Sequence, residues 1–282
     1  MIFPGLQVIP SLLSPAAQLS LLSRLLHRDL SDERHKTNVH MHYDISYPPT
    51  DDETPGSNRS PPESSFFRHS PTRADFCLPK DPSLHKPLTA SQFLGRKLRW
   101  MTLGGQYDWT EKVYPDADPP PFPSDIGDLL RGLFPETDAQ AAIVNLYSPG
   151  DTLSLHRDVS EESEKGLISI SIGCDAIFIV GLERNGPRKD VPGEAAQDDD
   201  VQYIALRLRS GDAVYMSGPA RFAWHGVPKI IPDTCPDWMK EWPAQPSSAD
   251  GGVDEFEAWR GWMGGKRINL NVRQMFDNKM ET

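Results

Sequence analysis

The chain has 282 residues, 38% of them hydrophobic and 24% charged, so it is long enough to bury a substantial core. Its 29 Lys and Arg residues against 40 Asp and Glu give a net charge of −11, which makes it poorly suited to non-specific coating of nucleic acid, because phosphate neutralisation supplies most of that affinity. A nucleic-acid substrate would need a local basic patch, and Arg96-Lys97-Leu98-Arg99 is either such a patch or an ordinary solvated end of a helix or strand.

The cysteine content and the absence of targeting patterns place the chain inside the cell. Its three cysteines are odd in number, widely spaced and without a C-x-x-C pair, which argues against a disulfide framework or a structural zinc site. No apolar run approaches the roughly 20 residues of a membrane span, and no signal peptide is recognisable. We expect no membrane partner and a location in the nucleus or cytoplasm, with the mitochondrion also open.

The first half of the chain predicts helices and irregular connections. Ser14-Pro15 is typical of a helix start, and leucines between Leu19 and Leu26 follow it at helical spacing. Residues 47–75 are rich in Pro and Ser and predict a mobile loop. A helix is expected over Ser91–Arg99, then a strand over Trp100–Leu103, and a further helix capped by Ser124.

From residue 139 onward the pattern is that of β-structure. Short strand-like runs are separated by turn residues at intervals that suit a sandwich or jelly roll. The predicted strands are 141–147, 166–173, 176–181, 201–208 and 212–216. Two irregular insertions are expected, an acidic one at 187–200 and a Trp-rich one at 232–265.

The motif His156-Arg157-Asp158, with His225 downstream, predicts a metal site. Two imidazoles and one carboxylate form the three-ligand face of non-haem Fe(II) oxygenases, which leaves positions open for co-substrate and O2. Zinc hydrolases more often use a helical H-x-x-x-H pair or three histidines. A rival cluster, His40-Met41-His42-Tyr43-Asp44, lies in a region without a matching anion site.

The segment Arg267–Arg273 predicts a strand that binds a dianion. Because strand side chains alternate, Arg267, Asn269, Asn271 and Arg273 share one face, and three apolar residues share the other. Asn145 and Tyr147 share a face of another predicted strand in the same way. Arginine pairs carboxylates bidentately, so a keto-diacid that also chelates the metal, 2-oxoglutarate, fits both features. The alternative is a solvated sheet face whose arginines pair with local acids.

These motifs together resemble the AlkB family of Fe(II)/2-oxoglutarate dioxygenases. The resemblance is carried by the run from Asn145 to Gly181, by His225-Gly-Val-Pro228, and by Arg267-x-Asn269-x-x-x-Arg273-Gln274. Upstream, Leu98-Arg-Trp-Met101-Thr102 and Phe122-Pro-Ser-Asp125 resemble most the eukaryotic AlkB homologue-one branch. About two thirds of the chain is covered.

The resemblance implies a fold and a set of site residues. The fold would be α+β and mainly β: a double-stranded β-helix (jelly roll) core at 139–282, a lid region at 91–138, and an N-terminal helix and loop at 1–90 that belong to the same unit. His156, Asp158 and His225 would bind Fe(II). Arg267 and Tyr147 would hold the distal carboxylate of 2-oxoglutarate, and Arg273, Asn145 and Asn269 would lie by its metal-proximal end.

The implied reaction is oxidative demethylation of a methylated base in tRNA or DNA, methyladenine or methylcytosine, with succinate, CO2 and formaldehyde as products. Trp109 and Tyr114 fall where the family places lid aromatics, although Trp109 also suits core packing, and Arg184 matches a substrate-facing position. Ser160 replaces a carboxylate of the bacterial repair enzyme, so base specificity should differ. The alternatives are a protein or small-molecule hydroxylase of the same superfamily and an inactive metal-binding module.

Overall fold

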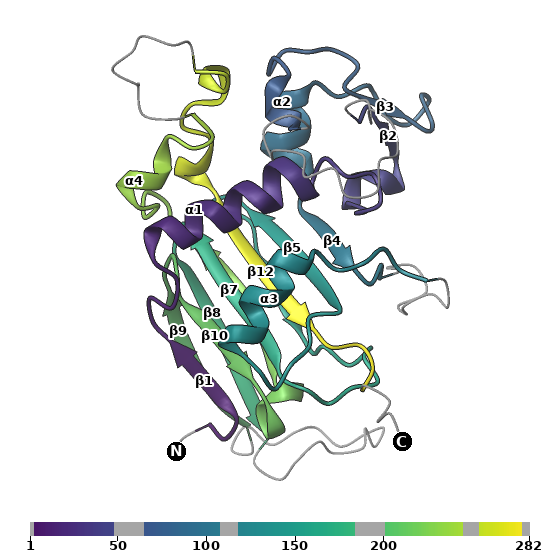
Figure 1. The fold of residues 1–282 in the computed structure, drawn as a ribbon. Coiled ribbons are helices and arrows are strands. Elements are labelled where there is room, and N and C mark those ends of the chain that lie inside the picture. The colour runs from purple at the N-terminus through teal and green to yellow at the C-terminus, as the bar shows by residue number, and fades with distance from the viewer. Residues whose placement is uncertain (1–2, 48–64, 108–117, 184–200, 245–253, 278–282) are drawn as a thin grey trace.

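The computed structural model describes residues 3–47, 65–107, 118–183, 201–244 and 254–277, and within them two antiparallel sheets form the body of the molecule (Figure 1). The strands are β1 (Leu6–Ile9), β2 (Tyr43–Ile45), β3 (Cys77–Pro79), β4 (Trp100–Gly104), β5 (Ala141–Tyr147), β6 (Leu153–His156), β7 (Leu167–Gly173), β8 (Ala176–Glu183), β9 (Val201–Leu208), β10 (Ala213–Met216), β11 (Trp224–Ile230) and β12 (Arg267–Arg273). The helices are α1 (Pro15–Ser23), α2 (Ala90–Gln92), α3 (Ser124–Leu133) and α4 (Asp237–Lys240), with π-helical turns at Arg24–Asp29 and Phe93–Lys97.

The larger sheet has six strands in the order β1-β10-β7-β12-β5-β4, and the smaller has four in the order β6-β11-β8-β9. Strands β2 and β3 form a separate pair. Apolar side chains of both large sheets, such as Ile170 and Leu270 from one and Phe178 and Val180 from the other, belong to a single buried cluster. The two sheets therefore share one hydrophobic core.

Helices α1 and α3 lie across one face of the six-stranded sheet (Figure 1). The π-helical turn that follows α1 is joined to the start of α3 by an ion pair between Arg28 and Asp125, with a nitrogen–oxygen distance of 2.6 Å. The apolar side of β12, made by Ile268, Leu270 and Val272, is fully buried. Because strand side chains alternate, the arginines of β12 point to the opposite side of the sheet, away from the helices.

The predicted elements are largely confirmed. Helix α1 begins as expected, with the Ser14 hydroxyl accepting a hydrogen bond from the Ala17 amide and Pro15 in the first turn. The expected strands match β5, β7, β8, β9 and β10 to within two residues, and β4 follows α2 and the second π-helical turn, which together occupy most of the helix expected over Ser91–Arg99. The edge strand β1 was not predicted, because its four residues are too few to show an alternation.

The prediction that Ser124 caps α3 is wrong. Pro123 occupies the cap position, with φ −55° and ψ 113°, and Ser124 is the first helical residue. The Pro123 carbonyl accepts the Gly127 amide at 2.9 Å, so it closes the first turn without a side-chain cap.

The Trp-rich insertion is less irregular than expected. It contains α4 and two short 3-10 helices, Glu257–Trp259 and Trp262–Gly265. Trp242, Trp259 and Trp262 surround Phe67 with ring centroids 5.1–5.3 Å away, so these tryptophans serve packing. The acidic insertion 187–200 lies outside the described residues, as do positions 48–64 of the predicted mobile loop. No helix among the described residues is long and apolar enough to cross a membrane.

Candidate metal and co-substrate site

Three side chains with metal-binding atoms converge between the two sheets. His156 ends β6, Asp158 follows it, and His225 lies opposite His156 in the β6–β11 pairing. Their ligand atoms all lie within 4.8 Å of one another, and the two imidazole rings are 4.3 Å apart. Each histidine Nε2 lies 3.8–3.9 Å from an Asp158 carboxylate oxygen. Among the described residues this is the one group of three or more such side chains that could hold a metal ion.

Backbone carbonyls orient both imidazoles. His156 Nδ1 donates to the Ser154 carbonyl at 2.9 Å, and His225 Nδ1 donates to the Ala223 carbonyl at 3.0 Å. A proton on each Nδ1 leaves each Nε2 lone pair available, which is the tautomer that a metal ligand needs. Burial lowers the pKa of His225, which favours the neutral form required for coordination.

Asp158 is held as a carboxylate by Arg273. Burial alone would raise the pKa of Asp158, but the Arg273 guanidinium and the two histidines outweigh it and hold the pKa well below its usual range. Arg273 Nη2 donates to Asp158 Oδ2 at 2.8 Å. This hydrogen bond orients the carboxylate and leaves Oδ1 without a donor among the described residues, so Oδ1 is the less engaged of the two oxygens.

Arg267 and Tyr147 form a second part of the site on the six-stranded sheet. They are direct partners in the β12–β5 pairing, and both are buried, with Arg267 1% exposed. Arg267 Nη2 donates to the Ser171 hydroxyl at 2.8 Å, and its Nη1 donates to the Cys174 carbonyl at 3.3 Å. Arg267 Nε and the Tyr147 hydroxyl have no hydrogen-bond partner among the described residues.

Buried donors without a partner are costly, so this pair fits a buried acceptor such as a carboxylate. Burial lowers the pKa of Arg267 to about 10 and raises the pKa of Tyr147 to about 12. Both groups therefore keep their protons at neutral pH. A positively charged guanidinium beside a neutral hydroxyl donor is suited to binding the distal carboxylate of a dicarboxylate.

The two asparagines named from the sequence are cross-strand neighbours. Asn145 lies opposite Asn269 in the β5–β12 pairing. Asn269 Nδ2 donates to the Ser169 hydroxyl at 2.8 Å and to the Ile170 carbonyl at 3.2 Å. Their role at the metal-proximal end of a co-substrate stays a prediction.

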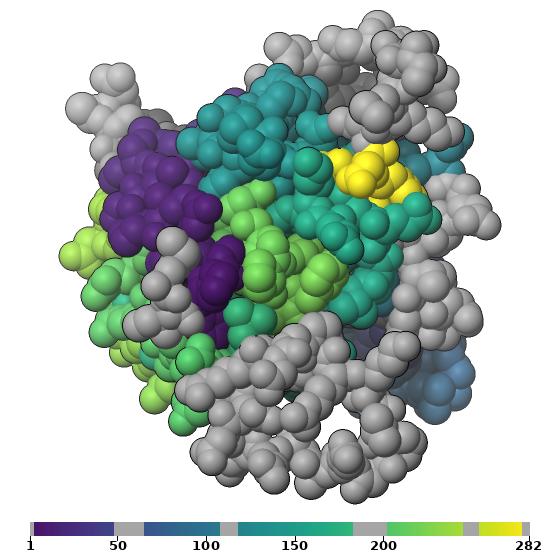
Figure 2. Space-filling view, turned by 90° about the horizontal axis from the view of Figure 1, so that it is seen from below, coloured from purple at the N-terminus to yellow at the C-terminus, as the bar shows by residue number. Residues whose placement is uncertain are grey.

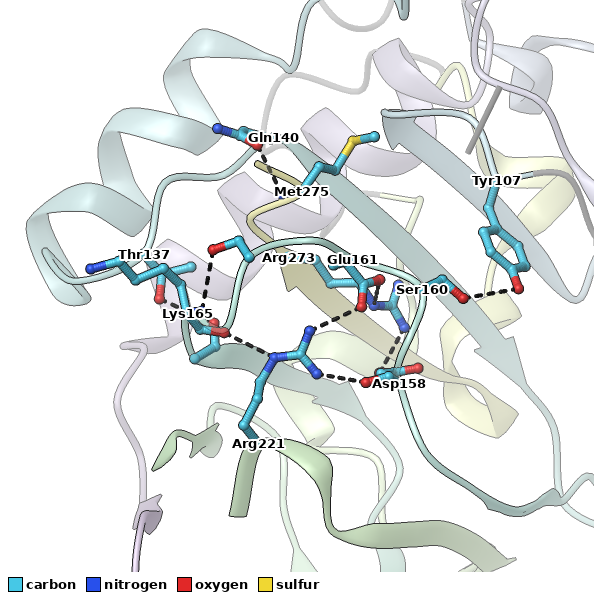
Figure 3. A network of polar contacts seen from close by, with 12 residues as sticks. Tyr107, Thr137, Gln140, Asp158, Ser160, Glu161, Lys165, Arg221, Arg273 and Met275 are labelled. Carbon is cyan, nitrogen blue, oxygen red and sulfur yellow. Dashed lines mark hydrogen bonds and ion pairs between the residues drawn. The ribbon is translucent and has the colours of Figure 1, made fainter. Parts of the chain in front are cut away.

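Sequence reasoning missed Ser171, Glu161 and Arg221. Ser171 could have been found, because its hydroxyl shares a strand face with that of Ser169, and the two alternate with three isoleucines. Arg221 is 1% exposed and lies in a 3-10 helix, Gly218–Phe222, where no periodic pattern marks it. Its guanidinium contacts Asp158 and Glu161, and Glu161 contacts Arg273 in turn (Figure 3).

The C-terminal segment after β12 contacts the loop that follows Asp158. The Met275 carbonyl accepts hydrogen bonds from the Glu162 and Ser163 amides, each at 3.0 Å. Seen from below, the yellow segment that follows β12 lies against the teal and green part of the surface (Figure 2). The connection between β6 and β7 is therefore bonded to the segment that follows β12.

The predicted substrate residues are described only in part. Ser160 is exposed and its hydroxyl lies 3.3 Å from that of Tyr107. Trp109, Tyr114 and Arg184 lie outside the described residues. In the basic patch Arg96 and Lys97 are exposed, whereas Arg99 pairs with Asp151.

The rival histidine cluster does not form a metal site of this kind. His40 Nδ1 accepts the Thr37 amide at 2.9 Å, and its Nε2 bonds the Tyr47 hydroxyl at 2.9 Å. Both ring nitrogens are thus engaged. His42 packs instead against His85, with ring centroids 5.0 Å apart.

Comparisons with known proteins identify the family. The family model of the 2OG-Fe(II) oxygenase superfamily matches residues 5–273. The chain is 51% identical over 277 residues to the N6-methyladenosine RNA demethylase ALKB1 of Pyricularia oryzae, covering 97% of this chain and 75% of that protein. It is 38% identical over 280 residues to the tRNA demethylase abh1 of Schizosaccharomyces pombe, covering 96% and 79%.

A solved structure, described as the structure of OsALKBH1, shares the fold. It matches with a TM-score of 0.53 at 17% identity and covers 97% of this chain and 98% of that one. Fe(II) and 2-oxoglutarate are the cofactor and co-substrate of the matched family, and the His-Asp-His group suits that metal. The chain therefore belongs to the 2OG-Fe(II) oxygenase superfamily, in the homologue-one branch of the AlkB family.

Proposed function

We propose that the protein removes methyl groups from bases in nucleic acid by oxidation, with RNA as the preferred substrate. One observation supports the site chemistry most strongly: a His-Asp-His group and a pair of buried unsatisfied donors, Arg267 Nε and the Tyr147 hydroxyl, occur between the same two sheets. A binding module that does not turn over 2-oxoglutarate would have no use for these donors. RNA is preferred because the two curated relatives compared above are named as RNA and tRNA demethylases.

In this proposal His156, Asp158 and His225 would hold Fe(II). Arg267 and Tyr147 bind the distal carboxylate of 2-oxoglutarate, and Arg273, with Asn145 and Asn269, lies by its other end. When bound, Fe(II) and 2-oxoglutarate together supply the O2-dependent oxidation of a methyl C–H bond. We also propose that the two sheets form a double-stranded β-helix with its core at 139–282 and a lid region at 91–138.

The protein's own residues bind and orient these groups. The Ser154 and Ala223 carbonyls fix the histidine tautomers, so that both Nε2 atoms face the metal position. The Ser171 hydroxyl holds one end of the Arg267 guanidinium, and in this proposal Nε and the Tyr147 hydroxyl donate to the same carboxylate. Burial excludes water from both donors and thereby strengthens their hold on a carboxylate.

The test is a panel of methylated substrates. Purified protein with Fe(II), 2-oxoglutarate and O2 is incubated with methylated tRNA, RNA and DNA oligonucleotides and with peptides, and nucleosides are quantified by mass spectrometry. Loss of methyladenosine or methylcytidine with equimolar formaldehyde and succinate is expected, and the His156→Ala variant should show none. Oxidation of peptides alone would replace this proposal with the protein hydroxylase that the acidic net charge also allows.

A further inference from the structure

One buried arginine, Arg221, donates hydrogen bonds to three positions of the loop that begins at the ligand Asp158. Its Nη1 donates to the Asp158 carbonyl at 2.7 Å, its Nε donates to the Lys165 carbonyl at 2.9 Å, and its Nη2 donates to Glu161 Oε2 at 2.9 Å (Figure 3). The three nitrogens thus hold both ends and the middle of one loop. A guanidinium suits this task because its donors have a fixed planar geometry.

Arg221 also belongs to the segment that carries another ligand. It lies four residues before His225, and Ala223, between them, accepts the His225 Nδ1 hydrogen bond. The arginine therefore connects the backbone that positions His225 with the backbone that positions Asp158. These two segments are joined elsewhere by the β6–β11 pairing, whose register shifts just after His225.

Glu161 extends the contact to the carboxylate of the same aspartate. Glu161 Oε1 lies 3.2 Å from Arg273 Nε, and Arg273 Nη2 donates to Asp158 Oδ2 at 2.8 Å. The chain of contacts starts at the Asp158 backbone, passes through Arg221, Glu161 and Arg273, and returns to the Asp158 side chain. Positive and negative groups alternate along it, and the side chains of all four are at most 11% exposed.

A buried ionic chain is poorly explained by stability alone. Desolvation of charges offsets most of their attraction, and apolar residues often stabilise a core as well. Such groups are well suited to fixing geometry, since every partner restricts the others. Here the geometry that is fixed is that of one ligand.

We propose that Arg221 is a positioning residue of the metal centre: it sets Asp158 relative to His225 and, through Glu161, holds Arg273 on Oδ2 so that Oδ1 stays available to the metal. The inference rests on the metal site in the proposed function and on no particular nucleic-acid substrate. It predicts that metal affinity depends on Arg221 although Arg221 is not a ligand.

The test measures metal binding without turnover. Mn(II) is titrated into the purified full chain, freed of metal, and its affinity is measured from the EPR signal of free Mn(II). Arg221→Lys keeps one charge but cannot reach three acceptors, so we expect about 10- to 100-fold weaker binding, the usual effect of losing an outer partner of a metal ligand. Glu161→Gln keeps both carbonyl contacts of Arg221 and should weaken binding less.

The matched control is Arg28→Lys. Arg28 contacts both Asp29 and Asp125 through several nitrogens, but it lies in the π-helical turn Arg24–Asp29 and its partners belong to that turn and to α3. This variant should bind Mn(II) like the wild type. A second readout, the KM for 2-oxoglutarate, should change less than the Mn(II) affinity in Arg221→Lys.

Equal Mn(II) affinity in wild type, Arg221→Lys and Arg28→Lys overturns the inference and leaves Arg221 a purely structural residue. Should Arg221→Lys not fold, Glu161→Gln decides, and wild-type affinity in that variant overturns the inference. A wild-type chain that binds no Mn(II) refutes the metal site itself, which is a separate and recognisable result.

Discussion

Replacing Tyr147 by Phe should make the free protein more stable and its co-substrate binding weaker. The Tyr147 hydroxyl is buried and has no hydrogen-bond partner among the described residues. A buried polar group without a partner costs about 1–3 kcal/mol, so removal of the hydroxyl should raise the free energy of unfolding by that order. The ring stays in place, so no cavity opens.

Binding of 2-oxoglutarate should change in the opposite direction. With a pKa raised to about 12, the hydroxyl is protonated at neutral pH and able to donate to a carboxylate. A hydrogen bond to a charged group is worth about 1.5–3 kcal/mol, which corresponds to a Kd increase of roughly 10- to 150-fold.

Two assays check this pair of effects. Urea unfolding of the metal-free chain gives the stability, and calorimetric titration of 2-oxoglutarate with Mn(II) present gives the Kd. Tyr215→Phe is the matched control, because the Tyr215 hydroxyl is bonded to that of Thr137 at 3.0 Å. It should lose about 1 kcal/mol of stability and keep its Kd. A Tyr147→Phe protein that is less stable than wild type and binds 2-oxoglutarate equally well would refute the assignment.

Three further outcomes are expected. His156→Ala should abolish both Mn(II) binding and succinate release, whereas Leu155→Ala, an exposed neighbour, should retain both; equal succinate release in His156→Ala would contradict the ligand assignment. Arg267→Lys should raise the KM for 2-oxoglutarate about 10- to 100-fold in initial-rate assays, because the lysine cannot bond Ser171 and a carboxylate together; an unchanged KM would speak against it. Burial lowers the pKa of His27 from 6.5 to about 4, so the unfolded chain binds more protons between these values and up to about 3 kcal/mol of stability should be lost as the pH falls through that window. Urea titrations from pH 7 to 4 should show a shallower decline for His27→Phe, and parallel declines would show that another group is responsible.

The central features of the site could be predicted because they follow strand alternation. Arg267 and Arg273 share a face of β12 opposite Ile268 and Leu270, and the structure places them there. The H-x-D spacing and a downstream histidine likewise identified the residues that converge.

The remainder depends on contacts between distant segments. Arg221 lies in an irregular 3-10 helix, and its partners are 56–63 residues earlier in the chain. The side chain of Glu161 is buried with Arg221 and Arg273, but no sequence pattern distinguishes it from its neighbour Glu162. Strand β1 joins the sheet through β10, about 200 residues later, which no local pattern reports.

Strand β12 occupies the middle of the six-stranded sheet, between β5 and β7. Before it is inserted, the strands on either side form two separate pieces, β1-β10-β7 and β5-β4, with no ladder between them. A ribosome makes β12 after all the other strands, so a partly synthesised chain can fold its flanks yet has neither Arg267 nor Arg273. We therefore expect a product terminated before β12 to lack both arginines and the strand that joins the two pieces of the sheet, and to be inactive.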